Sequence, residues 1–315
     1  MQTRPLGTSD LQVSVAGLGC NNFGGRIDLE ASRRVVHKAL DLGITLFDTA
    51  DSYGNRGGSE TALGAILGPR RKDVLLATKF GTQMDDAGSL RGASRGYIPR
   101  ALEASLKRLQ TDWIDLYQIH WPDPQTPIEE TLRALDDLVR QGKVRCIGCS
   151  NFAAWQMVEA QWTSRHQGLA AFVSCQNEYS LLVRDPEREL VPAMQAYGLG
   201  LLPYFPLASG LLSGKYRRGE PAPEGMRFDA MPQLVGRFLT DANWAVVERF
   251  EAFARARGRT PVEVASGWLA SRPTVASVIA GATKPEQVEQ NAAAIGWVPT
   301  AEDLAELDKI TNRTA

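Results

Sequence analysis

The sequence predicts an α/β protein in which eight parallel strands close into a (β/α)8 TIM barrel. Short β-rich runs recur along the whole chain, stretches with helical periodicity fill the intervals between them, and no linker or low-complexity segment interrupts the pattern. Strands that alternate with helices eight times over roughly 300 residues are typical of this barrel. We therefore expect a single domain over residues 1–315, with an N-terminal hairpin and extra helices.

The predicted strands are runs of mainly apolar and β-branched residues. In chain order they span 15–19, 44–48, 74–79, 114–120, 144–149, 172–176, 200–205 and 275–280. The predicted helices span 29–43, 59–68, 98–110, 128–142, 153–166 and 186–198, followed by a pair between 242 and 271 and a last helix over 284–296. Several close with a glycine, as helix C-termini prefer: Gly43, Gly68, Gly142 and Gly198.

An open doubly wound sheet is the alternative fold, and the glycines after the first strand test it. The stretch AGLGCNNFGG resembles a dinucleotide-binding loop, but counted from Gly17 the sixth position of G-x-G-x-x-G is Asn22. No acidic residue follows at the expected distance in the right role. The sequence therefore favours the barrel.

Composition excludes several classes of partner. The 35 Lys and Arg residues balance 36 Asp and Glu residues, for a net charge of -1, and no basic stripe is present. We expect neither nucleic acid nor an anionic membrane surface as a partner. The N-terminus lacks the apolar region of a signal peptide, and no window approaches the ~20 apolar residues of a membrane span, so we expect a cytoplasmic protein.

The four cysteines predict neither a disulfide framework nor a metal site. Cys146 and Cys149 form a CxxC, but VRCIGCS resembles the end of a strand, where residues three apart point to opposite faces. No second CxxC accompanies it, and no group of His, Cys and carboxylate residues has the spacing of metal ligands.

Ionisable side chains follow three successive predicted strands. The second strand ends at Asp48, with Tyr53 in the loop after it; the third ends at Lys79 and the fourth at His120. In a barrel the active site lies at the carboxyl ends of the strands. Each residue taken singly has a structural explanation, as a turn cap or a packing residue. Four at successive strand ends indicate one site.

The four residues make chemical sense as a proton donor and the groups that tune it. A free phenol has a pKa of about 10, and an ammonium ~4 Å away stabilises the phenolate by ~4 kcal/mol at an effective dielectric near 20, enough for two or three pKa units. Lys79 can supply that charge, Asp48 can hold the ammonium, and His120 can orient a substrate oxygen.

The sequence resembles the aldo-keto reductase superfamily across essentially its whole length. The resemblance rests on DTADSYG at 48–54, LLATKFG, IDLYQIHWPDP, GKVRCIGCSNF and VIAGATKPEQVEQN. It implies a barrel that binds NADP(H), with NAD(H) possible, and reduces a small-molecule carbonyl substrate. Tyr53 would be the general acid, Lys79 and Asp48 would lower its pKa, and His120 would direct the carbonyl. The branch looks bacterial and is also similar to the potassium-channel β subunits.

The resemblance also implies cofactor contacts. Ser150, Asn151 and Gln176 match residues at the nicotinamide carboxamide, and Tyr204 matches the aromatic side chain on which the ring stacks. The remaining implied contacts are Cys20 and Asn21 near the first strand end; Phe205, Pro206, Leu207, Ser209, Lys215 and Arg227 around the pyrophosphate; and Gly281, Thr283, Lys284, Gln287, Gln290 and Asn291 around the adenosine phosphate. The start of the helix at Thr283 and Lys284 favours an anion on dipole grounds.

Two positions depart from the family pattern. Gln290 replaces a common Glu, and Gln287 replaces an Arg found in many members, so the preference for NADP over NAD stays open. We expect Trp121 to form a wall of the substrate pocket. The stretch from 208 to about 240 has no firm period, and we expect it to close over the dinucleotide.

Two other functions stay open. The channel β subunits illustrate a nicotinamide-binding regulator or scaffold, but the intact set of Asp48, Tyr53, Lys79 and His120 favours an enzyme. A phosphate-binding barrel isomerase or aldolase could use Lys79, but would leave the SNF and last-strand motifs unexplained. We expect a monomer or weak homo-oligomer; the carbonyl substrate does not follow from the sequence.

Overall fold

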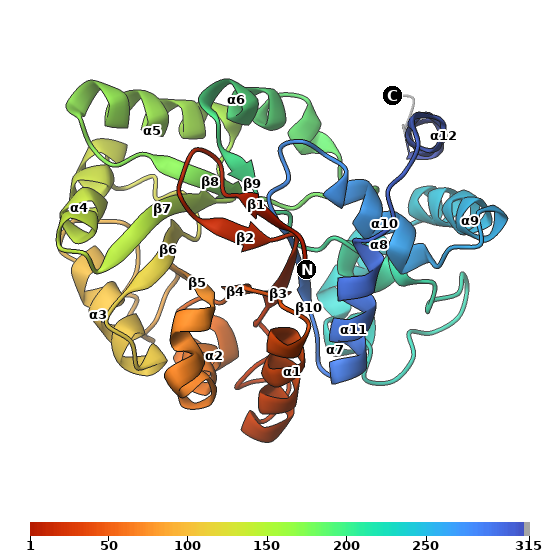
Figure 1. The fold of residues 1–315 in the computed structure, drawn as a ribbon, viewed down its shortest axis with the longest axis horizontal. Helices are drawn as coiled ribbons and strands as arrows, with labels where there is room; N and C mark the ends of the chain where they lie inside the picture. Colours follow the sequence, from red (N-terminus) through yellow and green to blue (C-terminus); the bar gives the residue numbers. More distant parts are fainter. Residues whose placement is uncertain (312–315) are drawn as a thin grey trace.

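The fold is an eight-stranded parallel barrel surrounded by helices (Figure 1). The computed structural model describes residues 1–311. The barrel strands are β3 (Ala16–Gly19), β4 (Leu46–Asp48), β5 (Leu75–Phe80), β6 (Ile114–Ile119), β7 (Val144–Ser150), β8 (Phe172–Gln176), β9 (Gly200–Leu201) and β10 (Val278–Gly281). Their order is β10-β3-β4-β5-β6-β7-β8-β9, and every ladder is parallel. The predicted barrel is confirmed.

The barrel closes between β9 and β10 through single backbone contacts. Leu201 forms an isolated parallel bridge with Val275, and its N–H donates to the carbonyl of Thr274 over 2.7 Å. The predicted strand over 200–205 is too long, because the ladder stops at Leu201 and only Tyr204 forms a further bridge, with Glu178. Pro203 lies between them, and proline has no N–H to donate to a ladder.

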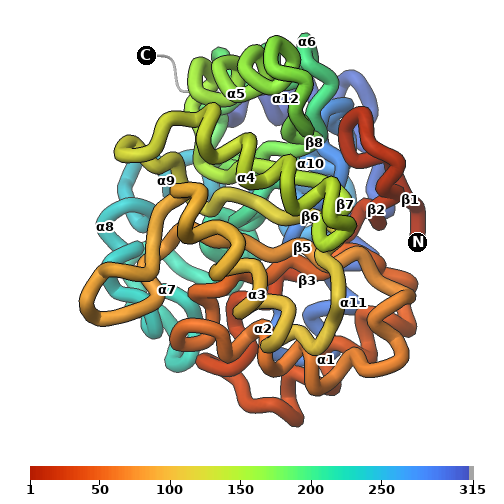
Figure 2. The backbone as a smooth tube through the Cα atoms, turned by 90° about the vertical axis from the view of Figure 1, so that its left-hand side faces the viewer, coloured from red at the N-terminus to blue at the C-terminus, as the bar shows by residue number. Residues whose placement is uncertain are grey.

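The N-terminal hairpin closes the far end of the barrel. Strands β1 (Thr3–Pro5) and β2 (Gln12–Ser14) pair antiparallel. Leu6, Leu11 and Val13 are buried with barrel-lining side chains such as Leu46 and Leu116 in one apolar cluster. In the side view the hairpin lies at one edge of the molecule and α7 (Arg227–Ala230) and α8 (Val235–Phe238) lie at the opposite edge (Figure 2). The open mouth of the barrel is therefore at the α7 and α8 end.

The helices form a layer whose apolar faces pack on the outside of the sheet. They are α1 (Leu29–Asp41), α2 (Tyr53–Leu67), α3 (Ile98–Leu109), α4 (Ile128–Arg140), α5 (Ala154–Gln167), α6 (Leu190–Tyr197), α9 (Asp241–Ala256), α10 (Pro261–Ala270), α11 (Pro285–Ala294) and α12 (Ala301–Thr311), besides α7 and α8. Short 3-10 turns occur at 68–73, 185–187, 208–213 and 232–234. The four glycines predicted to end helices all have positive φ, from 44° to 74°.

Two parts of the helical layer were not predicted. No helix was expected after 296, although Thr300 and Asp303 cap α12 reciprocally: the Thr300 N–H donates to Asp303 Oδ2 over 3.0 Å and the Asp303 N–H donates to Thr300 Oγ1 over 3.1 Å. That T-x-x-D signature was available in the sequence. The stretch from 208 to 240 contains short helical pieces, including α7 and α8, which are too brief to show a period.

Cys146 and Cys149 lie as predicted. Cys149 is fully buried in the layer between sheet and helices, whereas Cys146 packs against the cluster inside the barrel, so the two point to opposite faces of β7. All four cysteines are free.

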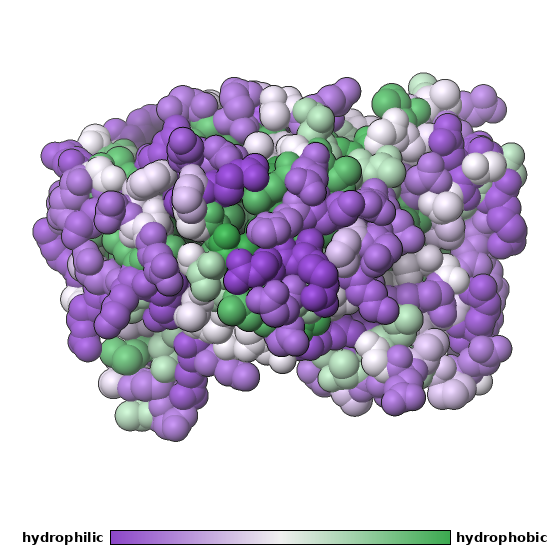
Figure 3. All heavy atoms as spheres, turned by 60° about the horizontal axis from the view of Figure 1, so that its bottom comes forward, coloured by the Kyte–Doolittle hydropathy of each residue, from purple (hydrophilic) through white to green (hydrophobic). Residues whose placement is uncertain are grey.

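On the face shown in Figure 3, hydrophilic residues cover most of the surface and hydrophobic ones appear in smaller groups between them.

Candidate active site

Lys79 lies at the centre of the predicted set and is fully buried. Its Nζ donates to Asp48 Oδ2 over 2.7 Å and to the Thr49 carbonyl over 2.9 Å. Both partners lie at the end of β4 or directly after it, and the lysine lies in the adjacent β5, so the parallel ladder brings them together. Burial alone would lower the pKa of Lys79, but the Asp48 carboxylate and the Tyr53 hydroxyl outweigh it and raise that pKa. The lysine is therefore an ammonium at neutral pH.

Gln176 completes the surroundings of Asp48 from the far side of the barrel. Its Nε2 donates to Asp48 Oδ1 over 2.8 Å. Both carboxylate oxygens are thus hydrogen-bonded, as a buried charge requires. Asp48 consequently holds the ammonium from β5 and the amide from β8 in fixed positions.

Tyr53 begins α2 and faces this ion pair. The centre of its ring lies 5.0 Å from Lys79 Nζ and 5.6 Å from the centre of the His120 ring, which meets it edge to face. Burial raises the pKa of Tyr53, while the charge and hydrogen bond of Lys79 lower it and the charge of Asp48 raises it. From the sequence, both Lys79 and Asp48 were expected to lower this pKa. That expectation is wrong in its net direction, because burial outweighs Lys79 and the pKa of Tyr53 is raised. It is also wrong for Asp48, whose own negative charge disfavours a phenolate.

His120 directly follows β6 and is neutral at physiological pH. Burial and the nearby Lys79 charge lower its pKa to about 3. Among the described residues its Nδ1 has no hydrogen-bond partner. The imidazole is thus an uncharged group that lines the cavity beside Tyr53.

A large cavity opens above these residues at the carboxyl ends of the strands. Its volume is about 860 Å³, enough for a dinucleotide-sized or drug-sized ligand. All predicted site residues line it except Cys20 and Lys79. Cys20 is fully buried in the layer between sheet and helices, so its side chain does not reach the cavity. Lys79 lies beneath the lining and contacts Asp48. Trp121 stands at the cavity with 54% of its surface exposed.

The residues after β7 and β9 form a hydrogen-bonded group on one wall. Tyr204 donates its hydroxyl to Asn151 Oδ1 over 2.7 Å, and Asn151 Nδ2 donates to the His120 carbonyl over 2.9 Å. Ser150 donates to the Gln176 carbonyl over 2.8 Å. Asn151 has a positive φ of 61°, a conformation that asparagine tolerates better than most residues. These bonds fix the wall next to His120.

Three cations converge at another part of the cavity. Arg26, Lys215 and Arg227 all line it, and within residues 1–311 none of them has an ion-pair partner. Burial and the charges of Arg227 and Arg26 lower the pKa of Lys215, and burial and the Arg26 charge lower that of Arg227. Ser209 lines the same cavity, and its buried Oγ has no partner among the described residues. The cluster is suited to bind an anion.

The start of α11 supplies a further positive region. Lys284 precedes the first residue of this ten-residue helix. The Thr283 N–H donates to Gln287 Oε1 over 2.7 Å, and the Thr283 hydroxyl donates to the same oxygen over 3.2 Å. Gln287 therefore orders the turn that leads into the helix, and Lys284 remains at the cavity where the helix dipole also favours an anion.

Sequence reasoning missed several cavity residues. One of them is Arg26, a cation of the cavity, whose guanidinium donates to the Gly225 carbonyl across the cavity rim. Its position in the loop after the first strand could have suggested it. Glu178 and Arg237 form an ion pair of 2.6 Å at the rim, and no sequence pattern pointed to either.

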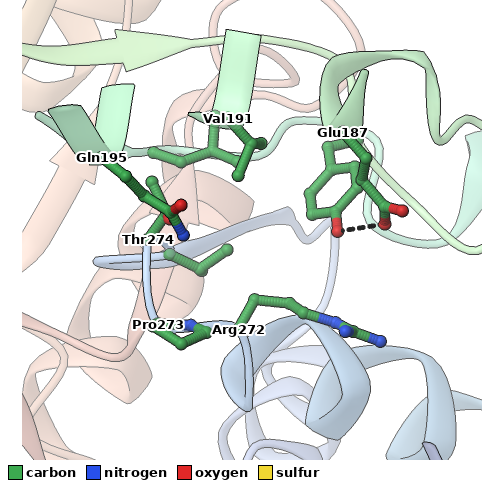
Figure 4. A pocket seen from close by; sticks show the side chains of 9 residues that line it. Glu187, Val191, Gln195, Arg272, Pro273 and Thr274 are labelled. Carbon is green, nitrogen blue, oxygen red and sulfur yellow. Dashed lines mark hydrogen bonds between the residues drawn. The ribbon is translucent and has the colours of Figure 1, made fainter. Parts of the chain in front are cut away.

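A second, smaller cavity of about 160 Å³ lies where β9 meets the segment before β10 (Figure 4). Most of its polar lining is paired internally: Tyr179 donates to Glu187 over 2.6 Å, and Gln195 Nε2 donates to Thr274 Oγ1 over 3.0 Å. Arg272 stacks over the Trp268 ring at 4.3 Å. This cavity contains none of the four predicted catalytic residues.

The described part of the chain has neither a cluster of metal ligands nor a membrane-spanning helix. Within residues 1–311 no group of three or more His, Cys, Asp or Glu side chains is arranged to hold a metal ion. The same residues form no helix that is long and apolar enough to cross a membrane.

The chain belongs to the aldo/keto reductase family, whose model matches residues 16–312. It is 38% identical to "Uncharacterized oxidoreductase YrpG" of Bacillus subtilis, over 94% of this chain and 91% of that protein. It is 36% identical to "Probable voltage-gated potassium channel subunit beta" of Oryza sativa, over 95% and 92%. It is 34% identical to "L-glyceraldehyde 3-phosphate reductase" of Escherichia coli O157:H7, over 98% and 92%.

Proposed function

We propose that this protein reduces an aldehyde or ketone to an alcohol with NADPH, and that Tyr53 donates the proton to the carbonyl oxygen. The observation that carries the proposal is the arrangement of Tyr53 and His120 at the cavity, above an ammonium at Lys79 that Asp48 holds at 2.7 Å. Family membership supports the same class of reaction. The reaction is reversible in principle, and Tyr53 would then accept the proton.

Each residue of the set has a distinct role in this proposal. The neutral His120 donates a hydrogen bond to the carbonyl oxygen and places it beside the Tyr53 hydroxyl. Lys79 stabilises negative charge on the Tyr53 oxygen as the proton leaves, and thereby offsets the cost that burial imposes on a phenolate. Asp48 keeps the ammonium in position. Trp121, at the mouth, would pack against the part of the substrate that extends outward.

The residues of the cavity fit a dinucleotide phosphate cofactor. Arg26, Lys215, Arg227 and the unpartnered hydroxyl of Ser209 suit a pyrophosphate, and Lys284 at the start of α11 suits an adenosine phosphate. Ser150, Asn151 and Gln176 would meet the nicotinamide amide and Tyr204 its ring. When bound, the cofactor would supply the hydride for the carbonyl carbon.

Preference for NADP over NAD is part of the proposal. Lys284 supports it because a 2′-phosphate would gain its ammonium, which has no ion-pair partner within residues 1–311, and a helix N-terminus. Gln287 contributes no charge because its side chain is a neutral amide, and its oxygen is already hydrogen-bonded to Thr283. A lower dissociation constant for NADPH than for NADH, with the difference reduced in Lys284→Ala, would support the assignment. Equal affinities for the two would contradict it.

The decisive experiment is NADPH oxidation by the purified protein over a panel of aldehydes and ketones that includes small phosphorylated aldehydes, since one relative is named for such a substrate. Tyr53→Phe is measured alongside. Turnover that falls at least about a hundredfold in the variant supports the proposal. NADPH binding without turnover of any carbonyl would instead favour a regulatory or scaffold protein, which similarity to the channel subunit makes the second candidate.

The predictions of a cytoplasmic location and of a monomer or weak homo-oligomer stay predictions. Size-exclusion chromatography with light scattering measures the second directly.

A further inference from the structure

Residues 51–57 form the turn that carries Tyr53, here called the Tyr53 turn. A second group of buried ionisable side chains lies next to this turn but outside the cavity. Asp51, two residues before Tyr53, is 1% exposed, and Glu60 on α2 is 0% exposed. Neither lines the cavity, so the proposed reaction does not use them directly. Both carboxyl groups are buried at the base of the turn that carries the proposed proton donor. Two buried negative charges are costly unless each is paired or one of them is neutral.

The hydrogen bonds of the two carboxyl groups differ. Glu60 Oε1 accepts from Thr78 Oγ1 at 2.5 Å and Oε2 accepts from Arg108 Nε at 2.7 Å, so Glu60 has the partners of a carboxylate. Asp51 Oδ1 accepts from Thr82 Oγ1 at 3.2 Å. Among the described residues, Asp51 Oδ2 has no partner, and neither does the hydroxyl of the fully buried Tyr117. Besides the Thr82 hydroxyl, the Ser52 N–H acts on the Asp51 carboxyl group as a hydrogen-bond donor. An ionised Asp51 would therefore be a buried charge with few donors among the described residues.

The charged and titratable groups around Asp51 come from every neighbouring element. Glu60 comes from α2, Arg108 from α3, Tyr117 from β6 and Tyr97 from the residue before α3. Burial and the Glu60 charge raise the pKa of Asp51 to about 7, while the hydrogen bond from Thr82 and the Arg108 charge act in the opposite direction. Arg108 is the one cation of this group, and it already pairs with Glu60.

The same residues hold both ends of the Tyr53 turn. The Asp51 N–H donates to the Lys79 carbonyl over 3.0 Å, which ties the start of the turn to β5. After Tyr53, residues 54–57 all have positive φ, from 59° to 114°. The Arg108 side chain lies directly on Gly57, where a Cβ would come within 2.5 Å of its Cδ. Glu60 fixes that guanidinium and therefore fixes the end of the turn.

We propose that Asp51 is a positioning residue for Tyr53: Asp51 and Glu60 together hold one proton, on Asp51, and this proton keeps the turn in the conformation that places the Tyr53 hydroxyl beside Lys79. The proposal rests on the proposed role of Tyr53 as proton donor. When the proton leaves Asp51 Oδ2 for solvent, two buried carboxylates act on each other while the nearby guanidinium of Arg108 pairs with Glu60 alone, and their repulsion loosens the turn. No other bond changes in this step.

Asp51→Asn tests the proposal because its side chain has the shape of the neutral carboxyl group and does not titrate. We expect kcat of the wild type to fall at least about threefold from roughly pH 6 to roughly pH 8.5, and kcat of the variant to stay within about 1.5-fold over that range. A variant that loses activity by the same factor at every pH, or keeps the wild-type profile, would refute the positioning role.

Two further variants should shift the midpoint of the fall in kcat with pH, the inflection of the pH profile, in opposite directions. Thr82→Val removes a hydrogen bond that favours the ionised form, so the inflection should move to higher pH. Glu60→Gln removes the neighbouring charge, so it should move to lower pH. If Glu60→Gln does not fold, the upward shift in Thr82→Val still decides the question, since an unshifted inflection in that variant would count against Asp51.

Two measurements without substrate separate this inference from the proposed reaction. Infrared difference spectra of wild type minus Asp51→Asn should show the carbonyl stretch of a protonated carboxyl group at about pH 6 and lose it by about pH 8.5. Hydrogen exchange of peptides covering 52–58, corrected for intrinsic rates, should rise over the same interval in the wild type alone. If no carbonyl compound is turned over but the infrared band and the change in hydrogen exchange both appear, the proposed reaction is refuted and the proton on Asp51 is supported. If the infrared band and the exchange change are both missing, this inference is refuted.

Discussion

Lys79 Nζ lies 2.7 Å from Asp48 Oδ2, and the two side chains are only 1% and 4% exposed. Neither charge has access to water, so each depends on the other and on the bonds from Gln176 and to Thr49. A buried pair of this kind is strongly destabilised when one partner is removed, because the other is left as an uncompensated charge.

We expect Lys79→Met to abolish measurable turnover and to lower the free energy of unfolding by roughly 3–5 kcal/mol. The double variant Asp48→Leu/Lys79→Met should regain most of the stability and none of the activity, because it removes both charges but restores no ammonium beside Tyr53. Urea unfolding followed by circular dichroism, with kcat measured in parallel, checks both statements. A double variant as unstable as the single one would show that the ion pair is not the source of the cost.

Tyr53→Phe should lower kcat at least about a hundredfold and leave the dissociation constant for NADPH within about twofold. The ring still packs against His120 at the same place, and only the hydroxyl that donates the proton is lost. Tryptophan fluorescence titration gives the affinity and stopped-flow absorbance gives the rate of the first turnover. Loss of NADPH affinity by more than tenfold would indicate a binding role instead.

His120 should not titrate between about pH 5 and pH 8, because its pKa is lowered to about 3. Its imidazole signals in two-dimensional NMR should stay at the neutral position over that range. His120→Asn should reduce kcat/KM by roughly tenfold to a hundredfold, through loss of a hydrogen bond to the substrate oxygen. A His120 signal that titrates near pH 6.5 would contradict the burial argument.

Arg26→Gln and Arg227→Gln should each raise the dissociation constant for NADPH by about tenfold, or roughly 1.4 kcal/mol. Each removes one unpaired cation from the anion-binding cluster, and the dependence of affinity on salt should weaken as well. Arg249→Gln, on the outer surface of α9, is the matched control and should change neither quantity. Isothermal titration calorimetry at two ionic strengths measures both. Unchanged affinity in Arg26→Gln would remove this residue from the proposed cofactor site.

Asp51→Asn should stabilise the protein at alkaline pH. The folded-state pKa of Asp51, about 7, lies above its ordinary value of 3.8, so between these values the native state holds more protons than the unfolded state. The contribution of this group is therefore fully present below about pH 4 and is lost as pH rises toward 7. At about pH 8 the variant should exceed the wild type by up to roughly 4 kcal/mol, the equivalent of three pKa units. Equal Tm values for the two at that pH would contradict the raised pKa.

The sequence predicted the barrel and the residues at its mouth for one physical reason. Asp48, Lys79, His120 and Gln176 each end or directly follow an apolar run, and parallel strands carry such residues to one edge of the sheet. Helix ends followed in the same way from glycines. Where the pattern was local but short, as at 200–205, it predicted a strand that Pro203 interrupts.

Side-chain direction and long-range contacts were beyond local pattern. Cys20 lies at a strand end like Asp48, yet it faces the helical layer and not the cavity. Arg26 and Arg227 are about two hundred positions apart and meet only because the 208–240 stretch folds back over the mouth. No periodicity in that stretch indicated which of its side chains would line the cavity.

The sequence by itself determined the barrel, the family and the identity of the residues around the mouth, because strand and helix periods are local properties of the chain. Only the tertiary structure decided the charge of each group: the neutral His120, the ammonium at Lys79, and a proton held by Asp51 beside Glu60. Ionisation depends on how completely a group is removed from water and which charges surround it. Those surroundings come from strands and helices far apart in the chain.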